Sequence, residues 1–144
     1  WIVDTAAAKE VSAPFAGESI ISLTFSGDES VLMAATATEV KAAATGTGAA
    51  LWSHPHERPK GLPPALAAAR HSTLAAVTLG KESIALIDSP GGSIRCRLTH
   101  PVTRTVRAIA FDAGGTHLAA VAGQFLQTWN LDAITESLRR QGME

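Results

Sequence analysis

Hydrophobic and polar positions alternate over several short stretches of the chain, and two of these stretches have the same layout. The first, IISLTFSGDESVLMAAT, begins at Ile20, and the second, VRAIAFDAGGTHLAAVA, begins at Val106. Each contains a six-residue run that ends in Phe, four turn residues, and then a second run. A period of two over this length favours a strand with one buried face, and the Gly and Asp of the turns tolerate a tight reversal. We therefore expect an antiparallel hairpin in each stretch.

A longer repeat becomes visible when the ends of the alternating runs are aligned. The equivalent positions, 40, 44 and 42 residues apart, are Val3-Asp4, Ala43-Ala44, Ile87-Asp88 and Trp129-Asn130. A period in the low forties is typical of the four-stranded blades of a β-propeller. The middle unit, ALAAARHSTLAAVTL, keeps the layout with Ala in place of larger side chains. The sequence predicts an all-β chain of four-stranded antiparallel meanders.

This repeat divides the chain into about three and a half blades. The expected divisions are the end of an incomplete blade at 1–16, a blade at 17–54, a Pro-rich loop at 55–63, a blade at 64–100, a blade lacking its outer strand at 101–131, and a helical tail at 132–144. Strands are expected at 1–4, 10–13, 20–25, 31–36, 39–44, 49–53, 65–69, 73–78, 83–88, 93–98, 106–111, 117–122 and 125–130. A short helix is expected at 134–141, with Asp132 as its N-cap and two arginines in its last turn.

The 27 alanines of the chain raise an alternative, a small helical bundle, because Ala is the best helix former. Gly, Pro and Thr interrupt the Ala-rich pieces every few positions. Pieces of this length do not form stable helices alone. The all-β interpretation is therefore preferred.

The third unit carries the clearest family pattern. In VRAIAFDAGGTHLAAVAG…LQTWNLD, a strand, an Asp/Gly turn and a second strand are followed by Trp129-Asn130 at a Trp-Asp position. His100 stands where a Gly-His pair opens such a repeat, and Gly17-Glu18 stands at the same place of an earlier repeat. Over nearly its whole length before the last dozen residues, the chain resembles a WD-repeat β-propeller. Its ending, LDAITESLRRQGME, is similar to the C-terminal tails of some bacterial WD-repeat proteins, which implies the last blades of a longer propeller.

One feature of that family is missing from the sequence. The family joins the Gly-His histidine, a turn Asp, a strand hydroxyl and the Trp in a hydrogen-bonded network. The corresponding turns here contain no Asp and read Ala37-Thr38, Gly80-Lys81-Glu82 and Gly123-Gln124. The resemblance therefore implies that the network is absent or degraded and that stability rests on packing between sheets.

Charge and composition exclude several classes of function. Twelve basic and thirteen acidic residues give a net charge of −1, which favours neither nucleic acid nor an anionic membrane as a partner. No apolar run approaches the roughly 18 residues of a membrane helix. The single Cys96 excludes an internal disulfide framework and a Cys-based zinc cluster. We expect a cytoplasmic protein, with the periplasm as the alternative.

A stretch without acidic residues provides the best candidates for partner binding. It runs from Ser89 to Phe111 and contains Arg95, Arg97, Arg104 and Arg107. Arg95 and Arg97 share one face of an expected outer strand. These arginines can bind an acidic partner, a phosphate or a carboxylate. The alternative is that charged side chains on an outer strand only discourage pairing between strand edges.

Other candidate residues have two interpretations each. Trp52 and Trp1 can anchor a protein partner or pack between blades. Cys96 can be activated by the arginines beside it, or it can face inward as an inert thiol. His54 and His56 lie two apart and are weak candidates for a metal site, the alternative being a solvated loop. No cofactor is expected. No Ser lies in a nucleophile-elbow motif, and no catalytic residue is expected.

The sequence therefore predicts a non-catalytic protein–protein interaction scaffold, whose loops and channel mouth present the binding residues. A first alternative is a structural part of a split or self-associating propeller. Because a ring needs four to eight blades, another segment of the parent chain or a second copy would complete it. A second alternative is a metal-binding propeller or an enzyme that uses His54 and His56.

Overall fold

The computed structural model of the chain describes residues 2–4, 9–12, 14–59 and 61–140. Its strands are β1 (Ile2–Asp4), β2 (Lys9–Ser12), β3 (Ser22–Phe25), β4 (Val31–Ala35), β5 (Glu39–Ala44), β6 (Ala50–Pro55), β7 (Leu66–Ala68), β8 (Leu74–Thr78), β9 (Ser83–Asp88), β10 (Ile94–Thr99), β11 (Val106–Phe111), β12 (His117–Ala122) and β13 (Phe125–Asn130), and its helix is α1 (Leu131–Arg140). Trp1, Ala13 and Gln141, which the sequence placed in expected elements, lie outside the described residues.

Strands that follow one another in the chain pair antiparallel, so that each sheet is a simple meander. One four-stranded sheet contains β3 to β6, a second contains β7 to β10, a three-stranded sheet contains β11 to β13, and β1 pairs with β2. The bounds of β5, β9, β11, β12 and β13 are those expected from the sequence. The prediction of an all-β fold with a short C-terminal helix is confirmed.

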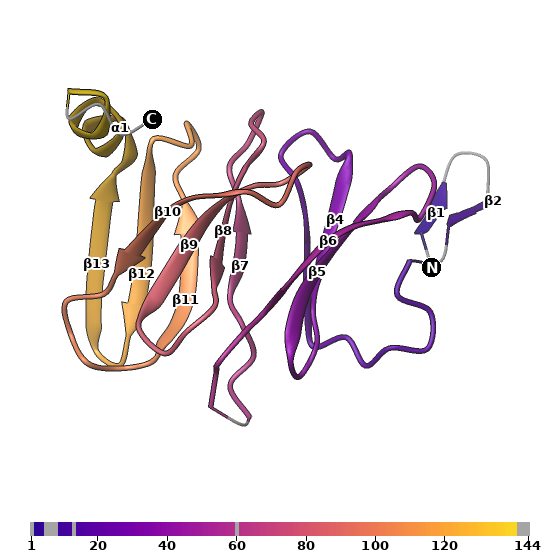
Figure 1. The fold of residues 1–144 in the computed structure, drawn as a ribbon, viewed down its shortest axis with the longest axis horizontal. Coiled ribbons are helices and arrows are strands. Elements are labelled where there is room, and N and C mark those ends of the chain that lie inside the picture. The colour runs from indigo at the N-terminus through magenta and orange to yellow at the C-terminus, as the bar shows by residue number, and fades with distance from the viewer. Residues whose placement is uncertain (1, 5–8, 13, 60, 141–144) are drawn as a thin grey trace.

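The sheets stand side by side with their faces in contact (Figure 1). Strand β7 contacts β3 on one side and β11 on the other, so the first strands of three sheets are neighbours. Along β9, Ile84 and Leu86 belong to the core shared with β11–β13, whereas Ala85 and Ile87 belong to the core shared with β3–β6. Because β9 is covered on both faces, it is apolar throughout its middle and shows no alternation in the sequence.

The Ala-rich middle unit forms strands, and the helical-bundle alternative is wrong. Ala75, Ala76 and Ala85 are fully buried between sheets. A side chain of one methyl group lets two sheet faces approach closely, which a larger residue at these positions would prevent. Tertiary packing therefore overrides the helix propensity of Ala here.

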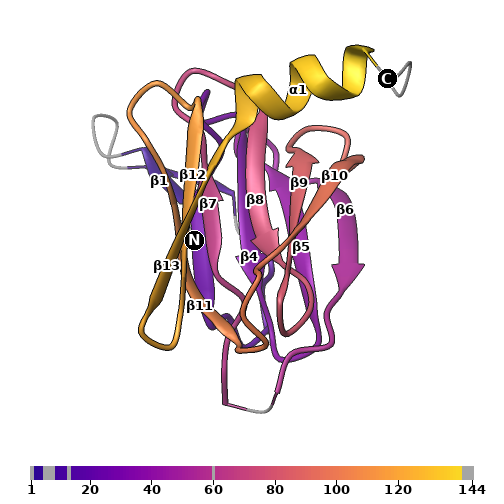
Figure 2. The same cartoon turned by 90° about the vertical axis from the view of Figure 1, so that its left-hand side faces the viewer.

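The C-terminal helix begins three residues earlier than expected. Strand β13 leads directly into α1, and the Asn130 side-chain Oδ1 accepts a hydrogen bond of 2.9 Å from the backbone N–H of Ala133. Asn130 is therefore the N-cap, and the prediction of Asp132 was wrong, since Asp132 lies inside the first turn. Leu131 is buried and its N–H donates to the carbonyl of Thr116, which fixes the start of the helix. Figure 2 shows α1 extending across the ends of β8 and β9.

His100 occupies the position expected from the family pattern but has only part of the expected hydrogen bonding. Its side chain is 2% exposed and lies edge-on to Trp129, with ring centroids 6.3 Å apart. Its Nδ1 accepts a hydrogen bond from the backbone N–H of Val102. Its Nε2 has no hydrogen-bond partner among the described residues. Among the described residues, the ring of His100 therefore has one hydrogen bond and one aromatic contact in place of the full network.

None of the described segments forms a helix that is long and apolar enough to cross a membrane.

Candidate functional site

Three cationic side chains from three segments line one small cleft, at the end of the sheets opposite α1 (Figure 1). Lys81 comes from the β8–β9 turn, Arg104 from the β10–β11 loop and Arg107 from β11. The cleft has a volume of about 280 Å³, and its other lining residues are Leu62, Thr103, Thr105 and Gly123. No acidic side chain is among them. Three positive charges that meet without a carboxylate make this cleft the best candidate for binding an anionic group.

The backbone around the cleft is held by hydrogen bonds between distant segments. The N–H of Val106 donates to the carbonyl of Lys81 over 3.0 Å. The half-buried guanidinium of Arg58 donates to the carbonyl of Gly80 over 3.3 Å and to that of Val106 over 2.7 Å. Burial lowers the pKa of Arg58. Neither Arg58 nor the role of Lys81 was expected from the sequence, because both residues lie outside the basic stretch that follows Ser89.

The arginines that the sequence grouped together are divided between two places. Arg104 and Arg107 line the cleft, whereas Arg95 and Arg97 lie exposed on β10. Arg95 forms an ion pair of 2.7 Å with Asp88. Both lie on the edge strand β10, but the register of this strand shifts between Ile94 and Cys96, and Arg95 lines a pocket together with Cys96, so the expectation that the two arginines share one face is not confirmed. Of the four arginines, Arg104 and Arg107 lie in the cleft with Lys81.

The side chains of His54 and His56 both form hydrogen bonds with backbone carbonyls. The Nε2 of His54 donates to the carbonyl of Gly92 over 2.7 Å, and the Nε2 of His56 donates to that of Thr36 over 3.1 Å. A carbonyl oxygen only accepts, so each Nε2 carries a proton. Within the described ranges, no group of three His, Cys, Asp or Glu side chains is close enough to hold a metal ion. His54 thus joins β6 to the neighbouring sheet.

Trp52 packs between two sheets, as in the second of the two interpretations above, packing between blades rather than anchoring a partner. Its indole N–H donates to the carbonyl of Ser89 over 2.6 Å, and the ring packs against the cores shared by β3–β6 and β7–β10. Gly92 lies directly against the indole, and a Cβ at this position would collide with the ring. Trp52 also lines a surface pocket on the β3–β6 sheet.

Cys96 is partly buried, whereas Arg95 and Arg97 on either side of it are exposed. The thiol packs against the core between the β7–β10 and β11–β13 sheets. Burial raises the pKa of Cys96. The arrangement therefore fits an inert thiol rather than an activated one.

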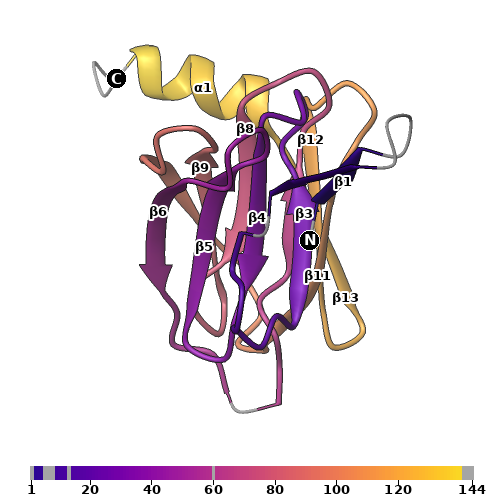
Figure 3. The same ribbon diagram turned by 90° about the vertical axis from the view of Figure 1, so that its right-hand side faces the viewer.

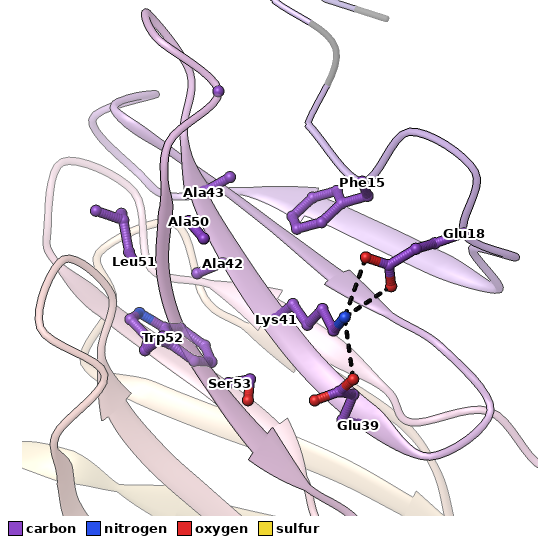
Figure 4. Close-up of a pocket in the computed structure, with 11 residues that line it drawn as sticks. Phe15, Glu18, Glu39, Lys41, Ala42, Ala43, Ala50, Leu51, Trp52 and Ser53 are labelled. Carbon is purple, nitrogen blue, oxygen red and sulfur yellow. Dashed lines mark hydrogen bonds and ion pairs between the residues drawn. The ribbon is translucent and has the colours of Figure 1, made fainter.

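The surface pocket on the β3–β6 sheet that Trp52 lines has a volume of about 420 Å³, larger than that of the cleft with Lys81. It lies beside Phe15 and Leu51 (Figure 4). Among the described residues that line it, the cation is Lys41, whose ammonium group lies 2.9 Å from Glu18 and 3.0 Å from Glu39. Hydrogen bonds to Glu18 and then Glu39 raise the pKa of Lys41. Because one ammonium group pairs with two carboxylates, these three side chains carry a net charge of −1 and offer no free cation to an anionic ligand.

The outer faces of the first and last large sheets expose apolar side chains. On the β3–β6 sheet, seen face-on in Figure 3, these are Ile21, Leu23, Phe25 and Leu51. Leu23 and Phe25 pair across β3 and β4 with Ala34 and Leu32, and therefore lie on the face opposite Val31 and Met33, which pack toward β7–β10. On the β11–β13 sheet, Val121, Phe125 and Leu126 are exposed. Leu32 and Ala34, which share this face, are buried, and Leu51 lies on the other edge strand, β6. We call the patch of Ile21, Leu23 and Phe25, at the β3 edge, the free apolar face.

No family model matches the chain, and no curated protein matches it. Solved structures do resemble it. Sqt1 from Chaetomium thermophilum, in complex with the N-terminus of the ribosomal protein L10, is 18% identical with a TM-score of 0.64, and the match covers 78% of this chain and 31% of that one. Hsv2 from Kluyvelomyces marxianus is 14% identical with a TM-score of 0.53, and the match covers 79% of this chain and 36% of that one. The chain thus spans about a third of the length of these proteins. What the resemblance shows is the fold: the stacked antiparallel meanders are blades of a β-propeller.

Proposed function

We propose that the chain is part of a non-catalytic protein-interaction scaffold. The observation that carries this proposal is the free apolar face, on which Ile21, Leu23 and Phe25 are 49%, 59% and 44% exposed. The opposite face of the same sheet packs on β7–β10 through similar apolar residues. Contiguous exposed apolar patches mark interaction sites. Sqt1, which has a related fold, was solved with a segment of another protein bound to it, which supports this function.

The same face supports a second candidate, a propeller completed by further blades. A ring contains four to eight blades, and the described sheets supply fewer complete ones. In this proposal residues 17–54, 64–100 and 101–131 are the last blades, the last of them without an outer strand, while 1–16 ends an incomplete blade and 132–144 is a helical tail. Another segment of the parent chain or a second copy would cover the free apolar face. A bacterial origin, suggested by the ending of the chain, and a cytoplasmic location belong to this proposal.

The experiment compares the chain with a Leu23→Asp variant by size-exclusion chromatography with light scattering, and by binding of a dye that fluoresces on apolar surfaces. If a second copy covers the face, the wild-type mass is that of two or more chains and Leu23→Asp returns it to one. If the face is kept for a different protein segment, the wild type is a single chain that binds the dye, and Leu23→Asp reduces that signal.

The matched control is Thr38→Asp, which adds the same charge at an exposed turn outside the face. A single chain that folds cooperatively and whose dye signal is the same in all three proteins would contradict both candidates.

A further inference from the structure

The cleft lined by Lys81, Arg104 and Arg107 combines charge, shape and a fixed frame. Within the described part of the chain none of these three side chains forms an ion pair, although the ion pairs of Arg95 and Lys41 show that acidic residues are available elsewhere. Three like charges in one cleft repel one another unless an anion lies between them. The threonines of the lining, Thr103 and Thr105, add hydroxyl donors.

Hydrogen bonds hold the backbone that carries the cations in place, whereas the three charged side chains themselves are exposed. The backbone N–H of Val106, the residue before Arg107, donates a hydrogen bond of 3.0 Å to the carbonyl of Lys81. The Arg58 side chain also joins the two segments, because it donates to the carbonyls of Gly80 and Val106. Arg104 lies against Gly123, where a Cβ would stand 3.0 Å from the Arg104 Cδ. A site whose backbone is already ordered in the folded protein loses less conformational entropy on binding, and therefore binds more tightly, than one that the ligand must assemble.

Size and charge limit the ligand. A volume of about 280 Å³ is too small for a peptide helix or a stretch of nucleic acid and fits one compact group. In the part of the chain that the structure describes, no aromatic side chain lines the cleft for stacking a base. A single carboxylate would leave two of the three cations unmatched, whereas a phosphoryl group carries roughly −1.5 to −2 charges and three acceptor oxygens at neutral pH. The planar fork of Arg pairs well with such oxygens.

We propose that this cleft binds a phosphate-bearing ligand, with Arg104, Arg107 and Lys81 as the contacting residues and Arg58 as a positioning residue behind them. The cleft belongs to the ends of the β7–β10 and β11–β13 sheets, whereas the free apolar face belongs to β3–β6. The two proposals therefore fail or succeed separately.

The test is a titration of the isotope-labelled full chain with inorganic phosphate and with pyrophosphate, followed by the backbone amide signals in NMR spectra. Sodium chloride at matched ionic strength and sodium glutamate are the comparison arms. We expect saturable shifts at residues 81 and 103–107 with phosphate and pyrophosphate, and only weak, unsaturated shifts with glutamate and chloride. Equal shifts in all four arms would overturn the proposal, and stronger binding of glutamate would replace the phosphate with a carboxylate ligand.

The variants separate contact from folding. Arg107→Gln and Lys81→Gln each remove one charge without touching the backbone frame, and each should weaken pyrophosphate binding about tenfold, as expected for a lost charge-assisted hydrogen bond. Arg70→Gln is the matched control, because Arg70 is exposed in the β7–β8 turn, at the opposite end of β8 from Lys81. Well-dispersed spectra establish that each variant is folded. Unchanged affinity in folded Arg107→Gln and Lys81→Gln, or an equal loss in Arg70→Gln, would overturn the assignment.

Discussion

The guanidinium of Arg58 donates a hydrogen bond of 2.7 Å to the carbonyl of Val106, a residue 48 positions further along the chain. The same side chain also donates to the carbonyls of Leu62, Pro63 and Gly80. One cation thereby ties the Pro-rich loop to both the β7–β10 and the β11–β13 sheets. Its charge meets only carbonyl dipoles in these contacts, yet it remains protonated at neutral pH, because the ordinary pKa of Arg is far above 7.

Replacing Arg58 by Met should destabilise the fold by about 1–3 kcal/mol, because the carbonyl of the buried Val106 and three less buried carbonyls lose a charged donor while the aliphatic stem is retained. The change is measured by urea unfolding followed by circular dichroism. Arg97→Met is the control, since Arg97 is exposed on β10, and it should change the free energy of unfolding by less than about 0.5 kcal/mol. Equal stability of the two variants would show that the Arg58 contacts contribute nothing.

Gly92→Ala should lower the free energy of unfolding by about 1–3 kcal/mol. Gly92 has a φ of 70°, and its added Cβ would meet the Trp52 indole. The displaced indole should also shift the tryptophan fluorescence of the folded protein. Gly46→Ala is the matched control, because Gly46 has no atom within 4 Å of an added Cβ and no left-handed φ. If both substitutions behave alike, the contact between β6 and the β9–β10 turn is not tightly packed.

The Asp112 carboxylate should titrate at an unusually low pH. The backbone N–H of His117, assisted by the Thr116 hydroxyl, lowers the pKa of Asp112 from 3.8 to about 2. A folded-state pKa below the unfolded value means that the stabilisation is present above 3.8 and is lost as the pH falls towards 2. An NMR titration of the carboxyl carbon measures the midpoint directly.

Thr116→Val removes one donor and should move that midpoint upward, while Thr128→Val, an exposed position on β13, should leave it unchanged. A midpoint near 3.8 in the wild type would mean that the β11–β12 turn does not hold the carboxylate.

The Cys96 thiol should react slowly with a disulfide reagent at pH 8, because burial raises its pKa and the side chain is partly buried against the core. Cys96 shares a pocket of about 270 Å³ with Ile134 and Leu138 of α1. Ile134→Asp should loosen the helix from this pocket and speed the reaction, towards the rate of the urea-unfolded chain. Ser137→Asp is the matched control, because it adds the same charge to α1 at an exposed position outside the pocket. Fast labelling of the folded wild type would contradict the burial of the thiol.

The sequence was sufficient to determine the strands and their order. Alternation from Ile20 to Phe25 and from Val106 onward, with Gly and Asp in the turns, depends on local sterics and on burial of one face, and these act within a few residues. It failed at the start of α1, where Asn130 and Asp132 are both good N-caps and the burial of Leu131 decided between them.

Only the tertiary structure decided which charged residues meet. Four arginines that are close in the sequence are divided by the path of β10, so that Arg104 and Arg107 join Lys81 while Arg95 pairs with Asp88. The role of Arg58 could not be predicted from the sequence, because its partners are backbone carbonyls up to 48 residues away. Every residue has a backbone carbonyl, so no residue type in the sequence marks such a partner. Strand formation is a local property of a pattern, whereas a cleft is made by contacts between distant segments, and those contacts exist only once the sheets have stacked.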